Sequence, residues 1–496
     1  MNNTQNKNNV RNAGNSNSAR KFTISDPNAK ATDSQRRAIG HAIKNGSWKR
    51  FSAEDWKNLT KGRASEIIDQ IRAKEGDPLA SWGQKKRFLE LVREGFLRGV
   101  KRETFKNLRN EQIKRMIYKG MKNKEAGTFA GPYLHPDDPA YSFSGQYLCS
   151  PSLVRHPDGF LLASMDLYQT RYPQNLTLIF RSDDDGVHWT HLAELFPCFW
   201  GKLFIHHGKL YMFGASTEYG DLQIGCSEDG GKTWSAPTVL FRGSGGKNGE
   251  SGWQCNPEPV VEYQGRIWYT VEWGQWERGY HAPAVLSAPV DADLLNAESW
   301  TVTQPVKYDK TWKGLPPGDS TGNIEGTLTV FPDGKLYDVM RYDMTKTTPN
   351  GGMAIIYRVD TEHPEEPLTF VRTMDFYANY AKFEILHDKE TGAYLTIASR
   401  FQDLAHAHCR NLLSLMYSYD MVTWHVACDI YDKSDEDPQK IGFQYVDYFV
   451  ENEDILFQCR VGWYGAASFH DANYAVFDRI ANFRRFLKKE NDRPKK

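Results

Sequence analysis

Three arginines recur at almost equal spacing in the second half of the chain. Arg341, Arg400 and Arg460 lie 59 and 60 residues apart, and each closes an apolar segment that reads VMR, ASR or QCR. A guanidinium group presents a planar fork of N–H donors that matches a carboxylate. Three of them at equivalent places in a repeated fold therefore predict a site for an acidic ligand.

Other side chains that could do chemistry stand at corresponding places. At the beginning of apolar segments they are Glu258, Glu325, Lys382, Tyr445 and Asp447. At the end of such segments they are Asp166, Glu272 and Trp273, while His281 and the His470–Asp471 pair lie in connecting segments. Carboxylates, Tyr and His are groups that transfer protons or act as nucleophiles.

The segments that carry these residues form a repeat. From about residue 126, short apolar runs alternate with Gly, Asp and Pro turns, which is typical of an all-β domain. A strand, a turn and a second strand recur six times, at intervals of 49, 57, 69, 58 and 62 residues, and each hairpin leaves room for two further strands. Six units of four antiparallel strands predict a mainly β chain with a six-bladed β-propeller over 126–489.

Propeller geometry brings the candidate residues together. The first strand of a blade begins near the axis, and the second strand returns to the same face. The strand starts and strand ends named above would therefore share one rim around one pocket. The same residues also allow structural roles: salt bridges between blades for Arg and Asp, the core for Tyr445, and loop hydrogen bonds for His281 and His470.

One motif indicates shape rather than chemistry. SDDDGVHW at 182–189 and SEDGGKTW at 227–234 share the pattern Ser-x-Asp-x-Gly-x-x-Trp, and SYDMVTW at 418–424 is a shortened copy. The Asp can accept backbone N–H groups across a turn, and the Gly takes a positive φ. With these motifs, GFQYVDYF and HDANYAVFDRIANFR, residues 128–486 resemble the sialidase-like Asp-box (BNR-repeat) propellers.

The resemblance implies roles for the rim residues. In sialidases three Arg hold the carboxylate of sialic acid, a Tyr activated by a Glu attacks the anomeric carbon, and an Asp protonates the leaving group. By position, these roles fall to the three arginines, to Tyr445 with Glu325, and to Asp166. His281 is a further catalytic candidate, and the remaining sugar-binding candidates are Glu258, Lys382, Asp447, Trp273 and His470. The reaction needs no metal and no organic cofactor.

Three functions stay open, because the sequence departs from the family at one place. Where sialidases open the first blade with Arg-Ile-Pro, this chain has Ser-Pro in LCSPSLVRHP. The first function is a glycosidase of exo-sialidase type acting on an acidic sugar. The second is a polysaccharide lyase, in which His281 or Tyr445 removes a proton beside a uronate carboxylate and the arginines stabilise the enolate. The third is a propeller that binds a glycan, or protein partners, without catalysis.

A second, basic module precedes the propeller. Residues 1–22 are rich in Asn and Ser and predict a disordered tail, and residues 490–496 form a charged C-terminal tail. Between 23 and 125, the stretches 31–68 and 80–117 align without gaps at an offset of 49, and each predicts a helical hairpin.

The formal net charge of zero conceals a split between the two modules. Residues 1–125 hold 29 Lys and Arg against 13 Asp and Glu, a balance of +16, and the remaining chain holds 33 against 49, a balance of −16. The basic repeats indicate a polyanion or nucleic acid as partner, or else a solvated helical adaptor.

The sequence also bears on where the protein acts. The seven Cys form no CxxC pair, no run of 18 apolar residues exists, and MNNTQNKNNVRNAGNSNSAR has no apolar segment of a secretory signal. We therefore expect reduced thiols, no membrane partner, and a cytoplasmic or virion-associated location.

Overall fold

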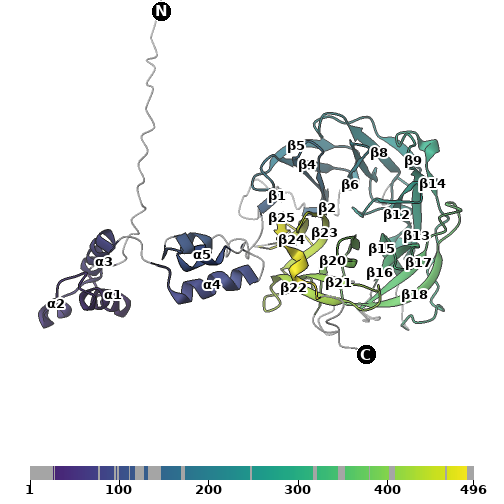
Figure 1. Cartoon of the computed structure of the whole chain (residues 1–496). Helices are drawn as coiled ribbons and strands as arrows, with labels where there is room; N and C mark the ends of the chain where they lie inside the picture. The colour runs from purple at the N-terminus through teal and green to yellow at the C-terminus, as the bar shows by residue number, and fades with distance from the viewer. Residues whose placement is uncertain are drawn as a thin grey trace, which may run out of the picture. The chain divides into compact units, whose positions relative to one another are not determined.

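The computed structural model describes residues 26, 28–75, 79–93, 97, 100–110, 112–117, 128–131, 147–168, 174–245, 249–316, 321–343, 352–378, 380–401, 408–463 and 466–488. The predicted tails, 1–22 and 490–496, lie outside these ranges. The chain divides into two compact units, a helical N-terminal one and a larger β one (Figure 1). Among the residues described, none of the helices has the length and apolar character that crossing a bilayer requires.

The helices that precede the propeller follow the 49-residue offset. The first stretch forms α1 (Asp33–Lys44), α2 (Ala53–Lys57) and α3 (Lys61–Glu75), and the second forms α4 (Trp82–Arg93), α5 (Arg102–Lys106) and a helical segment at 112–117. Corresponding backbone bridges, Lys30 to Thr60 and Leu79 to Arg109, link the start of each stretch to its third helix. Ile39, Leu59 and Ile67 are buried in the first stretch, and Phe88, Leu108 and Ile113 in the second.

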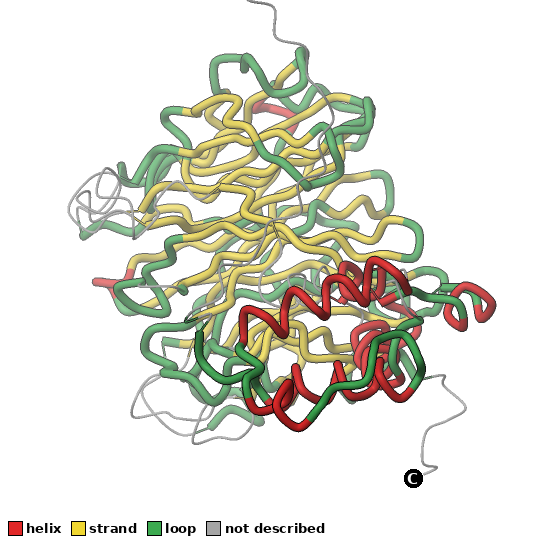
Figure 2. The backbone as a smooth tube through the Cα atoms, turned by 90° about the vertical axis from the view of Figure 1, so that its left-hand side faces the viewer, coloured by secondary structure: helices red, strands yellow, loops and turns green. Residues whose placement is uncertain are grey.

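The β unit is a six-bladed propeller, as the strand pattern predicts (Figures 1 and 2). Blade 1 consists of β2 (Tyr147–Arg155), β3 (Leu161–Tyr168), β4 (Thr177–Ser182) and β5 (Thr190–Leu195), and blade 2 of β6 (Phe199–His206), β7 (Lys209–Ala215), β8 (Leu222–Ser227) and β9 (Thr238–Phe241). Blade 3 consists of β10 (Gly252–Gln254), β11 (Val261–Tyr263), β12 (Arg266–Gln275), β13 (Tyr280–Pro289) and β14 (Thr301–Val302), where β10 and β11 both pair with β12.

The remaining blades complete the ring. Blade 4 consists of β15 (Gly322–Val330), β16 (Leu336–Asp343), β17 (Gly352–Arg358) and β18 (Thr369–Phe376). Blade 5 consists of β19 (Leu386–Asp388), β20 (Ala393–Ser399), β21 (Leu412–Ser418) and β22 (His425–Asp432). Blade 6 consists of β23 (Gly442–Glu451), β24 (Asp454–Gly462), β25 (Tyr474–Ile480) and β1 (Thr128–Gly131). The outermost strand of blade 6 therefore comes from the part of the chain that precedes blade 1, which the hairpin pattern does not reveal.

The Ser-x-Asp turns have one geometry. Each follows the third strand of its blade, and in each the Asp accepts a backbone N–H from further along the turn: His188 N to Asp184 at 2.8 Å, Thr233 N to Asp229 at 2.9 Å, and Thr423 N to Asp420 at 2.8 Å. The Trp that ends the motif packs against the neighbouring blade, as Trp189 does on Phe477 of β25 and Trp424 on Phe376 of β18. These contacts therefore hold neighbouring blades together.

Candidate active site

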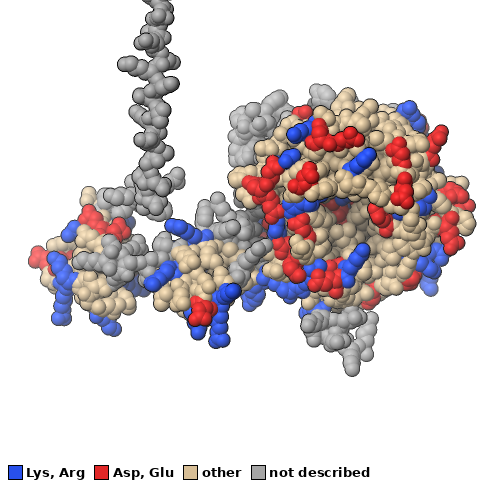
Figure 3. Space-filling model, turned by 45° about the horizontal axis from the view of Figure 1, so that its top comes forward, with Lys and Arg blue, Asp and Glu red and all other residues tan. Residues whose placement is uncertain are grey.

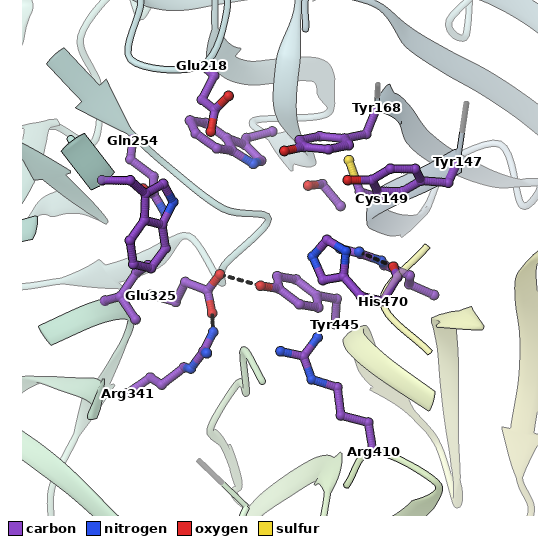
Figure 4. A pocket seen from close by; sticks show the side chains of 15 residues that line it. Tyr147, Cys149, Tyr168, Glu218, Gln254, Glu325, Arg341, Arg410, Tyr445 and His470 are labelled. Atoms are coloured by element: carbon purple, nitrogen blue, oxygen red, sulfur yellow. Dashed lines mark hydrogen bonds and ion pairs between the residues drawn. The ribbon is translucent and has the colours of Figure 1, made fainter. Parts of the chain in front are cut away.

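A pocket of about 200 Å³ collects side chains from the innermost strands of several blades and from the segments that follow their second strands (Figure 4). Its lining residues are Tyr147, Cys149, Ser150, Tyr168, Trp200, Glu218, Gln254, Trp276, Ile324, Glu325, Arg341, Arg410, Tyr445, Arg460 and His470.

Four of the lining residues share an unusual backbone. Ser150, Trp200, Glu325 and Tyr445 have positive φ values of 49°, 56°, 55° and 55°. Each lies in the innermost strand of its blade, where the strand register shifts by a β-bulge. Residues with a β-carbon adopt this conformation only at a cost in free energy, and bulges redirect a side chain at functional places. The bulges thus direct the side chains of these four equivalent residues into the same pocket.

The centre of the pocket is a linked Tyr–Glu–Arg set. The Tyr445 hydroxyl donates a hydrogen bond to Glu325 Oε1 at 2.6 Å, and Arg341 Nη1 lies 2.5 Å from Glu325 Oε2. Burial favours the neutral form of Glu325, but the charge of Arg341 and the bond from Tyr445 outweigh it and hold the pKa of this carboxyl below its ordinary value. Burial, reinforced by the Glu325 charge, raises the pKa of Tyr445 to about 12. At neutral pH the pair is a carboxylate and a phenol.

Two further guanidinium groups are buried without a counter-ion. Arg410 and Arg460 are 5% and 4% exposed, and within the described parts of the chain neither lies within 4.0 Å of a carboxylate oxygen. Arg410 donates to the Tyr380 carbonyl at 2.8 Å and Arg460 to the His470 carbonyl, but the Nε atom of each is buried without an acceptor. Burial, followed by the charges of Arg341 and Arg460, lowers the pKa of Arg410 to about 10. Buried uncompensated cations favour an anionic ligand.

The opposite wall is aromatic. Figure 4 shows Tyr147, Tyr168 and Glu218 on the side away from Arg341 and Arg410. Trp200 and Trp276 also line the pocket, and Trp276 is 49% exposed. Rings with one polar edge are suited to the mixed surface of a sugar. Glu218, 4% exposed, is the carboxylate on this wall.

The structure brings five of the predicted residues into the pocket: Glu325, Tyr445, Arg341, Arg460 and His470. Burial and the nearby Arg460 charge lower the pKa of His470 to about 4, so its ring is neutral at physiological pH. Its Nδ1 lies 3.0 Å from Asp471 Oδ1.

Arg400 does not reach the pocket. The hydroxyl of the preceding residue, Ser399, donates toward blade 6, to the Phe443 carbonyl. Since successive side chains of a strand point to opposite faces, Arg400 points the other way, to Ser414 at 3.1 Å and Asp429 at 2.9 Å. Arg410, at the start of the third strand, takes the third cationic place instead. A shift of one residue along a strand moves a side chain to the opposite face of the sheet. The spacings of 59 and 60 residues between the three arginines are not exact enough to predict that face.

Glu258, Lys382 and Asp447 are not pocket residues either. They lie in a buried ionic cluster between blades, in which Lys202 binds Asp447 at 2.6 Å and Lys382 binds Glu384 at 2.5 Å, with Glu258 at 3.9 Å from Lys382. Burial raises the pKa of Glu384 to about 7 and that of Glu258 well above its ordinary value. Lys202–Asp447 joins β6 of blade 2 to β23 of blade 6, and Lys382–Glu258 joins the segments that precede β19 and β11, so the cluster lies in the core of the ring.

Asp166, His281 and Trp273 lie behind the pocket wall. Asp166 is fully buried and accepts from Thr177 at 2.5 Å and from the Trp200 backbone N–H at 2.8 Å, and burial raises its pKa to about 7. His281 is bonded to the Tyr219 hydroxyl at 3.1 Å, and burial lowers its pKa to about 4. Trp273 packs on Trp253 at a ring distance of 4.9 Å. Each therefore supports the wall and does not line the cavity.

Sequence reasoning missed Arg410 and Glu218. Arg410 in HCRNLL and Glu218 in STEYG lie in segments that lack the repeated pattern of strand starts and ends, so no spacing singles them out. As for metals, the described residues contain no group of three or more His, Cys, Asp or Glu arranged to hold an ion.

No protein-family model and no curated protein sequence matches the chain. Among solved structures, the chain is similar to an α-L-arabinanase from Penicillium chrysogenum in complex with arabinobiose, at a TM-score of 0.48 and 14% identity, over 73% of this chain and 99% of that one. A sialidase from Trypanosoma rangeli in complex with sialic acid gives a TM-score of 0.45 and 13% identity, over 67% and 54% of the two chains. An ulvan lyase of family PL25 gives 0.40 and 11%, over 67% and 78%. Likenesses at this level carry no argument about chemistry, which has to come from the pocket.

Proposed function

We propose that the protein is a glycoside hydrolase of the Asp-box propeller type that releases an acidic sugar from a glycan. The observation that carries the proposal is the hydrogen bond of 2.6 Å from Tyr445 to the ionised Glu325, next to buried guanidinium groups that lack counter-ions. A base paired with a nucleophile beside a cationic site suits a sugar that carries a carboxylate next to its reacting carbon.

The residues have separate roles in this reaction. The sugar carboxylate binds Arg410 and Arg460, whose free donors and positive charge it satisfies. Glu325 takes the phenol proton as Tyr445 Oη forms a bond to the anomeric carbon, and the bond to the leaving oxygen breaks. Glu218, on the opposite wall, gives its proton to the leaving oxygen. Water then attacks the anomeric carbon, returns a proton to Glu218, and displaces Tyr445, which recovers its own proton from Glu325.

The negative charge of the sugar carboxylate next to the reacting carbon is the reason for a phenol as nucleophile in this proposal. A phenol is neutral before attack, so it approaches a carboxylated sugar without repulsion, whereas a carboxylate would not. Arg341 keeps Glu325 ionised and so keeps the base available. The pKa of about 12 for Tyr445 makes this base necessary.

One observation favours a second candidate, a polysaccharide lyase. His470 lines the pocket as a neutral imidazole, since its pKa is lowered to about 4. A neutral ring beside two arginines can take the proton next to a uronate carboxylate while the arginines stabilise the enolate. The two candidates differ in their products, because a lyase leaves an unsaturated sugar.

The test is a screen of the whole chain on 4-methylumbelliferyl sialoside, glucuronide and arabinoside and on polyuronates. It measures released umbelliferone and absorbance of unsaturated products. We expect hydrolysis that Glu325→Gln and Tyr445→Phe reduce at least a thousandfold while thermal stability is retained. Loss with His470→Gln but not with Tyr445→Phe, together with unsaturated products, would establish the lyase. Binding without any turnover would leave a glycan-binding propeller.

A further inference from the structure

Two buried acidic side chains, Asp166 and Glu272, occupy equivalent positions in different blades. Asp166 of β3 pairs with Cys149, and Glu272 of β12 pairs with Gln254. Both Cys149 and Gln254 line the pocket. Each acid thus stands on the second strand of its blade, opposite the pocket end of the innermost strand.

Each carboxylate accepts from the bulge of the next blade. The Trp200 N–H donates to Asp166 Oδ2 at 2.8 Å, with the Gly201 N–H directed at the same group. The Gly326 N–H donates to Glu272 Oε1 at 3.2 Å, with the Glu325 N–H directed at it as well. In blade 5 the corresponding contact differs, because the Ser399 hydroxyl donates to the Phe443 carbonyl just before the bulge at Tyr445.

Burial of the Glu272 side chain costs free energy, which its hydrogen bond to the Gly326 N–H has to offset. Its side chain is 1% exposed, and its Oε2 is buried without a hydrogen-bond partner. Gly326 is fitted to the contact, because a β-carbon there would overlap Met340 and Asp338. A buried carboxyl with one unpaired oxygen is unfavourable as mere packing, which points to a role in the bulge that it binds.

We infer that Glu272 is a positioning residue, which holds the Glu325–Gly326 bulge and thereby keeps Glu325 on Tyr445. The extra residue of the bulge is what directs Glu325 into the pocket. If the strand slipped to regular pairing, the side chain at 325 would move to the opposite face. The consequence for catalysis rests on the proposed function, whereas the hydrogen bond itself does not.

The experiment compares Glu272→Ala, which removes the acceptor, with Glu272→Gln, which keeps an amide oxygen in its place. Asp166→Ala is the matched control, because it removes the same contact from the Trp200 bulge. Hydrogen–deuterium exchange of the folded proteins is read at single residues. We expect exchange at 325 and 326 to become at least tenfold faster in Glu272→Ala alone, and exchange at 200 and 201 to do so in Asp166→Ala alone.

The second readout is turnover of the 4-methylumbelliferyl glycoside that the wild type cleaves. We expect Glu272→Ala to lower kcat at least tenfold with KM within about twofold, and Glu272→Gln to restore kcat. Unchanged exchange at 325 and 326 in Glu272→Ala would overturn the inference, as would faster exchange with full kcat. If the wild type cleaves no glycoside, the proposed function fails by itself, and the exchange data still decide whether Glu272 holds the bulge.

Discussion

Glu325 and Tyr445 share one proton through their hydrogen bond. Arg341 keeps that proton on Tyr445, because its charge stabilises the Glu325 carboxylate. Because Arg341 stabilises the carboxylate, Glu325 would lose its proposed role as base only when the pH falls below the ordinary range of a Glu. We expect Arg341→Gln to raise the pKa of Glu325 and to shift the acidic limb of the kcat profile upward by about one pH unit or more.

The matched control for that shift is Arg460→Gln. Arg460 lines the same pocket but forms no ion pair with Glu325, so its loss should raise KM and leave the limb where it is. The measurement is kcat and KM of the glycoside between pH 3 and pH 8. An acidic limb that is identical in the wild type and Arg341→Gln would show that another group, not Glu325, is the base.

At this scale the sequence predicted the pair but not its whole surroundings. Glu325 and Tyr445 lie at equivalent positions near the starts of their strands, and both have a φ of 55° at a β-bulge. Arg341 and Arg460 stand at equivalent strand ends. Arg400 fails by one residue, because strand alternation sends it to the other face, and Glu218 lies in a segment without a repeat. The repeat of the strands predicts which residues lie at a strand end. The direction in which each side chain points depends on a bulge or on an offset of one residue, which the repeat does not show.

Among the elements, the Ser-x-Asp turns belong to the ring and not to the pocket. Asp229 accepts from the backbone N–H groups of Lys232 at 3.0 Å and Thr233 at 2.9 Å. We expect Asp229→Ala to lower the Tm by roughly 2–5 °C, the shift for one or two lost hydrogen bonds, with kcat unchanged. Thermal unfolding and turnover check this, and Glu228→Ala, an exposed neighbour in the same turn, is the control.

The same turn gives a pH dependence with a definite sign. The bonds from Thr233 lower the pKa of Asp229 to about 2 in the folded protein, below the 3.8 of the free side chain. A depressed folded pKa stabilises the fold above pH 3.8, and the contribution disappears as the pH falls through about 2. The Tm difference between the wild type and Asp229→Ala should therefore shrink between pH 7 and pH 2.5. A constant difference would mean that the charge of Asp229 does not matter.

Across the whole molecule, the excess of basic residues lies in 1–125, which contain the helical repeats, and the excess of acidic residues in the part that forms the propeller. Figure 3 shows Lys and Arg side chains projecting from the helical unit. Six exposed cations stand at positions 49 residues apart in the two stretches: Arg37 and Lys86, Lys44 and Arg93, Lys57 and Lys106. A basic surface that repeats in this way suits a linear polyanion, and we expect nucleic acid to bind it.

That expectation is tested on the full chain with a fluorescein-labelled 30-nucleotide single strand. Changing all six positions to Gln should raise Kd at least tenfold and reduce the slope of log K against log salt. The control replaces six exposed propeller lysines, namely Lys209, Lys232, Lys310, Lys313, Lys335 and Lys389. Absence of binding at low salt, or equal loss in both variants, would remove the helical unit as the binding surface.

The propeller could be predicted from six hairpins at regular intervals, but its closure could not. Strand β1 pairs with β25 over Thr128–Phe477, Phe129–Val476 and Gly131–Ala475. Four residues are too short a segment to be recognised as a strand without its partner, and the partner lies more than three hundred positions away in the chain. Long-range pairing of this kind leaves no periodic trace in the sequence.

The pairing of β1 with β25 has a consequence for the order in which the ring can close. During synthesis β1 is made before every other strand of the ring and its partner β25 last, and Tyr445 and Arg460 of the pocket belong to the same last blade. A translation product that stops before blade 6 lacks both Tyr445 and the strand that closes the ring, so under the proposed function we expect it to be inactive.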